Sequence, residues 1–114
     1  MKKIQNHVQV IGRLGAAPEV KVLENGKRYA RFSVAVSNSY TTRAGEKVTD
    51  VQWHTVLAWG ILATVAERLL QKGTQLTVDG RLSNRSYTNR DGYKITVTEI
   101  IADELFVLQN RSAA

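Results

Sequence analysis

Alternation of apolar and polar residues runs through much of this chain and predicts β-strands. Residues 28–37 show it most clearly, because their even-numbered positions from residue 30 onward are Ala, Phe, Val and Val. Side chains of a strand point alternately to opposite faces, so this segment is expected to be a half-buried strand. Similar patterns predict further strands at residues 4–14, 19–23, 51–60, 75–88 and 93–108.

The period changes in residues 61–72, where apolar side chains recur at helical spacing. The pattern predicts one amphipathic helix of about three turns. Lys72 is placed in its last turn, and Gly73 is expected to end it. The residues predicted to face the core from this helix are Leu62, Val65, Ala66, Leu69 and Leu70. In the following strand the inward residues are expected to be Leu76, Val78, Gly80 and Leu82.

The connections carry turn signals of different strength. Residues 38–50 are polar and predict a long connection with a turn at Ala44–Gly45. Asn89–Gly92 contains Asp-Gly between two alternating segments, which is a strong hairpin signal. The inward phase of the last strand changes near Glu99, which predicts a β-bulge there. The glycines at positions 12 and 15 indicate a bend or a close approach of backbone.

The order of elements is strand, strand, strand, helix, strand, strand, with residues 19–23 as a short extra strand or a continuation. This all-β order with one helix predicts the OB fold, a five-stranded Greek-key barrel with its helix between strands three and four. An open antiparallel sheet capped by a helix would give the same pattern. We expect one domain over residues 1–108, followed by a short polar C-terminal end at 109–114.

Charge and composition narrow the classes of function. The 114 residues carry a formal net charge of +6, which favours a polyanionic partner without proving one. There are no cysteines, so disulfides and thiolate metal sites are excluded. No apolar run is long enough to span a membrane, and the N-terminus turns polar where a signal peptide would be apolar. We therefore expect a cytoplasmic protein.

Candidate catalytic groups are few. His7 and His54 both lie in strand patterns, and His54 is in the inward phase, where a packed histidine is commoner than a catalyst. Asp103 and Glu104 are adjacent in a strand and so point to opposite faces. The sequence has no metal-ligand spacing, phosphate loop or dinucleotide motif. We expect no enzyme activity and no cofactor.

Aromatic residues are more informative. Trp53 and Trp59 share one face of their strand, Tyr40 lies in the polar connection, and Tyr87 is in phase with two arginines. Single-stranded nucleic acid binds by stacking bases on such rings, with cations along the phosphates. The alternative, that the two tryptophans lie in the core or a subunit interface, is about as probable from those two residues alone. The two tyrosines are hard to place in a core and tip the balance toward binding.

Tyr29 and Tyr93 are weaker candidates and are expected to be ordinary strand residues. The expected phosphate contacts on strands are Arg31, Arg81 and Arg85. Those expected on loops are Arg43, Lys47 and Arg90.

Several short segments occur in a specific order. They are V-Q-V-I-G-R-L-G-A-A-P-E-V (8–20), N-G (25–26), F-S-V-A-V-S (32–37), Q-W-H-T-V (52–56), L-L-Q-K-G-T-Q-L (69–76), D-G-R-L (79–82), D-G-Y (91–93) and I-A-D-E-L (101–105). In this order and spacing, they resemble the bacterial single-stranded DNA-binding proteins across nearly the whole chain.

That resemblance implies an OB-fold homotetramer that wraps single-stranded DNA in replication, repair and recombination. It places the stacking aromatics at Tyr40, Trp53, Trp59 and Tyr87 and makes His54 a subunit-interface residue. Members of the family usually continue into a flexible linker and an acidic tip that recruits other enzymes. This sequence stops at Q-N-R-S-A-A, so either it is truncated or it is a short variant without that tail, and tail-dependent partners are not assumed. Two alternatives stay open: an OB-fold accessory protein of replication restart, and an OB-fold protein-assembly subunit.

Overall fold

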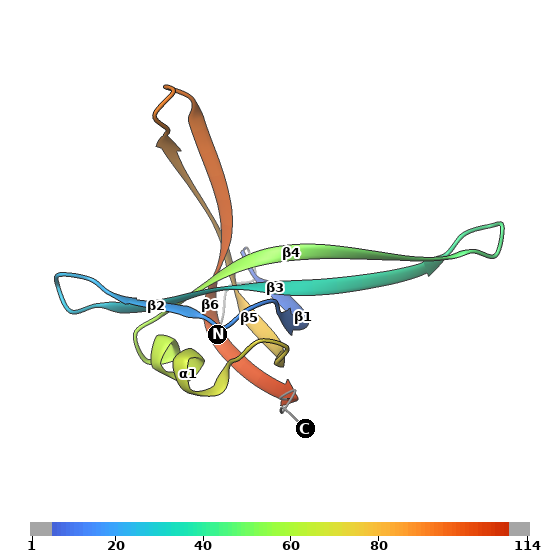
Figure 1. Ribbon diagram of the computed structural model, residues 1–114, viewed down its shortest axis with the longest axis horizontal. Helices are drawn as coiled ribbons and strands as arrows, with labels where there is room; N and C mark the ends of the chain where they lie inside the picture. Colours follow the sequence, from blue (N-terminus) through green and yellow to red (C-terminus); the bar gives the residue numbers. More distant parts are fainter. Residues whose placement is uncertain (1–5, 110–114) are drawn as a thin grey trace.

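A computed structural model describes residues 6–109 of the chain. Its elements are β1 (Val8–Leu14), β2 (Glu19–Val22), β3 (Arg28–Thr41), β4 (Lys47–Trp59), α1 (Ile61–Leu69), β5 (Gln75–Thr88) and β6 (Lys94–Gln109) (Figure 1). The first predicted strand therefore begins at residue 8, and positions 4 and 5 lie outside the described residues. The last strand extends one residue into the predicted C-terminal end.

The strands form one closed barrel. Their order is β1-β5-β6-β4-β3-β2, and an additional pairing of β1 with β3 joins the ends of the sheet. That closing pair is Arg13 with Ala35 and Leu14 with Val34. β2 pairs only with β3 and lies outside the closure. The predicted five-stranded OB barrel is confirmed, and the open-sheet alternative is wrong.

Gly12 permits this closure. A Cβ atom on Gly12 would lie 2.2 Å from the carbonyl oxygen of Ala35, which is closer than any side chain can come. Glycine is therefore required where β1 passes from β5 to β3, as the predicted close approach indicated.

Two long hairpins leave the barrel as arms (Figure 1). The β3–β4 ladder continues without interruption to Thr41 opposite Lys47, and the β5–β6 ladder continues to Thr88 opposite Lys94. The predicted long connection at residues 38–50 is therefore wrong, since only residues 42–46 form the turn. A two-stranded arm meets water on both faces, so its strands can be polar throughout and show no alternation.

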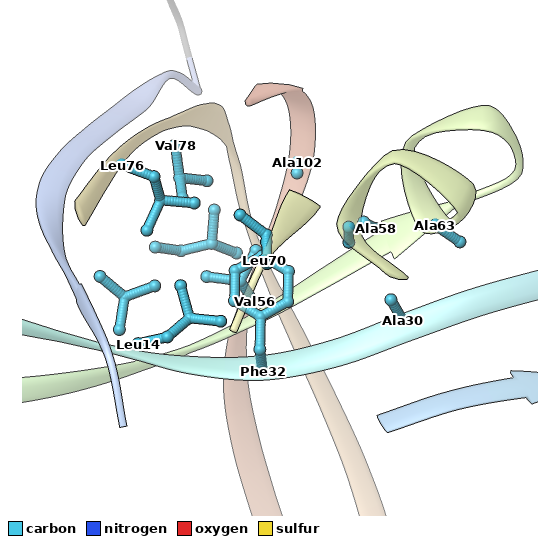
Figure 2. Close-up of a cluster of buried hydrophobic side chains, with 13 residues drawn as sticks. Leu14, Ala30, Phe32, Val56, Ala58, Ala63, Leu70, Leu76, Val78 and Ala102 are labelled. Carbon is cyan, nitrogen blue, oxygen red and sulfur yellow. The ribbon is translucent and has the colours of Figure 1, made fainter. Parts of the chain in front are cut away.

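The core lies inside the barrel, and side chains from several strands meet there (Figure 2). Phe32 lies at its centre and is only 4% exposed. The inward phase predicted for β3 is confirmed, because Ala30, Phe32 and Val34 are all buried. From β4, Val56 and Ala58 are buried beside them, as their phase predicted.

Helix α1 covers the barrel through Ala63 and Ala66, which are fully buried. It ends at Leu69, so Lys72 and Gly73 lie beyond it and the prediction of three turns is wrong. Leu70 turns extended and buries its side chain, which takes the chain out of the helix toward β5. Leu69, expected to be inward, is consequently 50% exposed.

Two details of the β5–β6 ladder differ from prediction. Two register shifts leave Asp103 and Leu108 of β6 as extra residues, because Asp79 pairs with Glu104 and Gly80 with Ala102, and Gln75 pairs with Gln109 and Leu76 with Val107. The ladder passes Glu99 without a shift. Leu82, expected to be inward, is 48% exposed. β5 pairs with β1 only as far as Gly80, whereas β6 still pairs with β4 at Ile100, so Leu82 lies beyond the part of β5 that belongs to the barrel.

Candidate nucleic-acid interface

The two tryptophans lie on the outer face of the β3–β4 ribbon. Trp53 pairs with Ala35 and Trp59 with Tyr29, so both rings are in the phase opposite to Phe32 and the core. Trp53 is 59% exposed and Trp59 is 41% exposed. Large apolar rings with this exposure are available for stacking, and their expected outward orientation is confirmed.

Gly15 holds the Trp53 ring in place from behind. A Cβ atom on Gly15 would lie 2.6 Å from Cζ3 of Trp53, so the ring packs directly on the glycine backbone. The amide of Gly15 donates a hydrogen bond to the carbonyl oxygen of Ser33, which fixes that backbone against β3. Trp53 and Arg31 line a hollow of about 440 Å³ beside this contact.

Tyr29 packs against Trp59, with ring centroids 5.1 Å apart and a tilt of 37° between the rings. Tyr29, expected to be an ordinary strand residue, thus lies beside one of the predicted stacking rings. The signal that could have found it was present, since Tyr29 is in the outward phase of β3. Its position beside Trp59 depends on the register between the strands, which the sequence does not show.

Tyr40 and Tyr87 lie on different arms. Tyr40 is 57% exposed on β3, and Tyr87 is 49% exposed on β5 near the end of the other arm. Tyr40 belongs to the even phase of β3, opposite to the phase of Trp53's partner Ala35. The four predicted aromatics are therefore all exposed, but they do not share one flat surface. A strand that touches all of them must wrap around the molecule.

Two of the predicted arginines are held in ion pairs. Nη1 of Arg81 lies 3.2 Å from Oδ1 of Asp103, and Nε of Arg85 lies 2.8 Å from Oε1 of Glu99. The hydrogen bond to Glu99 and the negative charge of that carboxylate raise the pKa of Arg85 above its ordinary value. Both cations are thus partly neutralised where they stand, and each would have to share its charge with a phosphate.

The other four predicted cations are less constrained. Arg31 lies on the tryptophan face, Arg43 and Arg90 lie in the turns at the arm ends, and Lys47 is the first residue of β4. The placement of Lys47 in a loop is therefore wrong. All four are exposed, and none forms an ion pair within residues 6–109.

The two histidines lie away from this face. His54 is half-buried on the inner phase of β4, opposite the buried Val34. His7 contacts the carboxylate of Asp79. Within the described part of the chain, no three His, Cys, Asp or Glu residues are grouped so that they could hold a metal ion. Its only helix is too short to cross a lipid bilayer.

Known proteins share this sequence and this fold. The model of the single-strand binding protein family matches residues 5–108. A curated single-stranded DNA-binding protein of Neisseria meningitidis serogroup A is 37% identical over 107 residues, which are 94% of this chain and 62% of that protein. Single-stranded DNA-binding protein 1 of Xylella fastidiosa is 36% identical over 104 residues, covering 90% of this chain and 76% of that protein. The chain thus spans about three fifths of the length of the meningococcal relative.

Two solved structures are similar in fold. The Plasmodium falciparum SSB in complex with single-stranded DNA superposes with a TM-score of 0.85 at 27% identity, covering 96% of this chain and 99% of that one. A deletion mutant of the single-stranded DNA binding protein from Thermus aquaticus gives a TM-score of 0.80 at 28% identity, over 93% of this chain and 51% of that one. With its OB barrel and its exposed outer tryptophans, the chain belongs to the single-strand binding protein family.

Proposed function

We propose that this chain binds single-stranded DNA with little sequence preference and protects it during replication, repair and recombination, without enzyme activity. The observation that carries the proposal is the pair of exposed tryptophans on the outer face of β3–β4. Arg31, which forms no ion pair in the described residues, lies opposite Leu57 and so between the two tryptophans along the ribbon. Exposed rings stack on bases of any sequence, and a nearby cation holds the phosphates. Tyr40 and Tyr87 extend the path onto the two arms.

A fluorescence titration tests this function. The chain has only two tryptophans, and both lie at the proposed site, so tryptophan emission reports on that site alone. Adding oligo(dT) at low salt should quench the emission to saturation. If the four unpaired cations all contact phosphates, the logarithm of the affinity should fall with the logarithm of salt with a slope of about −3, at roughly 0.7 per contact.

Duplex DNA and heparin are the controls for charge alone. Both are polyanions, but neither offers free bases to the rings, so both should bind more weakly than oligo(dT) and leave the tryptophan emission nearly unchanged. Equal, weak binding of all three would instead favour the protein-assembly subunit. An absence of quenching by oligo(dT) would contradict the proposed site.

We also infer that the chain assembles as a homotetramer in the cytoplasm, with His54 at a subunit interface. An exposed apolar surface supports assembly: Ile11 on β1 is 53% exposed and Phe106 on β6 is 50% exposed. Thr77 of β5 pairs with Ile11 on one side and with Phe106 on the other. Residues paired in this way point to the same face, so the three side chains are neighbours on one face of the barrel. That face lies on different strands from the tryptophans, so it can be covered while DNA is bound.

Replacing Phe106 with Glu should break this assembly, because a charge would be buried in an apolar contact. Light scattering after size exclusion should show a tetramer for the unchanged chain and smaller species for Phe106→Glu. Val22→Glu is the matched control, since Val22 is 60% exposed on β2 and outside this face. A stable dimer of the unchanged chain would favour the replication-restart accessory protein.

A further inference from the structure

A small pocket lies where the β5–β6 arm leaves the barrel beside the tryptophan face. Its volume is about 300 Å³, and its lining includes the ring pair Tyr29 and Trp59 and the ion pair of Arg85 and Glu99. Arg31 reaches it from β3. Aromatic rings, a free cation and an ion pair therefore meet in one hollow on the proposed DNA path.

The ion pair in this pocket fixes the orientation of the arginine. Nε of Arg85 donates to Oε1 of Glu99 at 2.8 Å, and Nη2 donates to Oε2 at 3.4 Å. Glu99 is 2% exposed, whereas the side chain of Arg85 is 54% exposed. Nη1 donates to no acceptor among residues 6–109. The guanidinium thus presents its outer edge, with parallel N–H groups on Nη1 and Nη2, away from the carboxylate.

Charge decides what this outer edge favours. Glu99 neutralises Arg85, so a phosphate gains little attraction here and is repelled by the nearby carboxylate. A neutral base that offers two adjacent acceptors loses nothing from that carboxylate. The exposed side of the Trp59–Tyr29 ring pair gives such a base a surface for stacking.

We propose that this pocket binds a guanine base of the single-stranded DNA, with O6 and N7 accepting hydrogen bonds from Arg85 and the ring stacked on Trp59. Guanine presents these two acceptors side by side, whereas adenine and thymine each present a single acceptor at the corresponding edge. Arg31, which is unpaired in the described residues, holds the adjacent phosphate. The proposal rests on the proposed function and adds a base preference at one subsite of a path that is otherwise sequence-tolerant.

Three oligonucleotides test the preference on the unchanged protein. The first is oligo(dT), the second carries isolated guanosines among the thymidines, and the third carries 7-deazaguanosine at the same positions and so lacks only N7. The guanosine oligonucleotide should bind at least about 5-fold more tightly than the 7-deaza form, at the lower end of the range for a bidentate arginine–guanine contact. Equal affinity for the two would overturn the proposal. A further oligonucleotide carries isolated cytidines, which also present adjacent acceptors. The proposal would likewise be overturned if it gained as much affinity over oligo(dT) as the guanosine oligonucleotide does.

For each variant, the measured quantity is the ratio of its affinity for the guanosine oligonucleotide to its affinity for the 7-deazaguanosine oligonucleotide. Arg85→Lys keeps a positive charge beside Glu99 but loses the planar fork, so its ratio should fall to about 1. Arg81→Lys is the matched control, because Arg81 is also on β5 and also ion-paired, yet lies outside the pocket. Its ratio should stay at the original value, and a ratio that survives Arg85→Lys would contradict the assignment. Failure of the proposed function is distinguishable, because then oligo(dT) itself would not bind.

Discussion

Replacing Trp53 with Ala should weaken binding of oligo(dT) by about 1–3 kcal/mol, which is roughly 5- to 150-fold. The ring is 59% exposed and packs on the backbone of Gly15, so its outer face is free and its position is fixed. Removing it takes away a stacking platform without opening the core. The affinity is best measured by competition with a labelled oligonucleotide, because the substitution removes one of the two tryptophans whose emission would report binding.

Two controls separate stacking from structure in this experiment. Trp53→Phe keeps an aromatic face and should retain most of the affinity. Tyr93→Ala removes another exposed ring, 69% accessible, that lies at the turn before β6 and is not in the proposed path, so it should have little effect. If Trp53→Ala instead changed the assembly seen by light scattering, the ring would belong to a subunit interface.

Replacing Phe32 with Ala should lower the free energy of unfolding by about 3–5 kcal/mol. Phe32 is 4% exposed at the centre of the barrel, where the side chains of Leu14, Val56 and other core residues surround it (Figure 2). Its removal would therefore leave a cavity. A domain of this size is stabilised by about 5–15 kcal/mol in total, so the loss would be a large fraction. Denaturant unfolding at one fixed protein concentration measures it, because the proposed assembly would make stability depend on concentration.

Ile61→Ala is the matched control for that loss. Ile61 is also a large apolar residue, but it is 84% exposed at the start of α1. Its replacement should change stability by no more than about 0.5 kcal/mol. Equal losses at the two positions would contradict the assignment of Phe32 to the centre of the core.

The barrel and the β5–β6 arm were predictable from the alternation of their strands and from the Asp-Gly turn, whereas the β3–β4 arm was not, because its strands bury neither face. Residues 30–36 alternate and were placed correctly, together with the start of the helix at Ile61 and the hairpin at Asn89–Gly92. Tyr40 was placed in a loop because its neighbours Asn, Ser and Thr show no alternation. Those polar residues nevertheless form a continuous ladder, which is set by the partner strand rather than by the local pattern.

The composition of the proposed binding face was predictable, but the pairing of its residues across the sheet was not. Phase put Trp53 and Trp59 on one face of their strand but left core and binding face equally probable, and Tyr40 and Tyr87 decided for an exposed face. Whether an arginine is free depends on which residue stands opposite or diagonal to it across the sheet. Glu99 reaches Arg85 only because β5 and β6 pair in a register that brings Ser83 opposite Glu99 and leaves Arg85 on the diagonal. The contact of Tyr29 with Trp59 was not predictable for the same reason, because it depends on the register of β3 with β4.

The contact between Gly15 and Trp53 has a consequence for how tightly the chain can hold DNA. Immobilising a side chain that was mobile before binding costs roughly 0.5–1.5 kcal/mol of the affinity. Trp53 packs on the Gly15 backbone before any base arrives, so most of its rotational freedom is already lost on folding. The smallest residue of the site thereby preorganises the largest one, although it offers no side chain to touch the ligand.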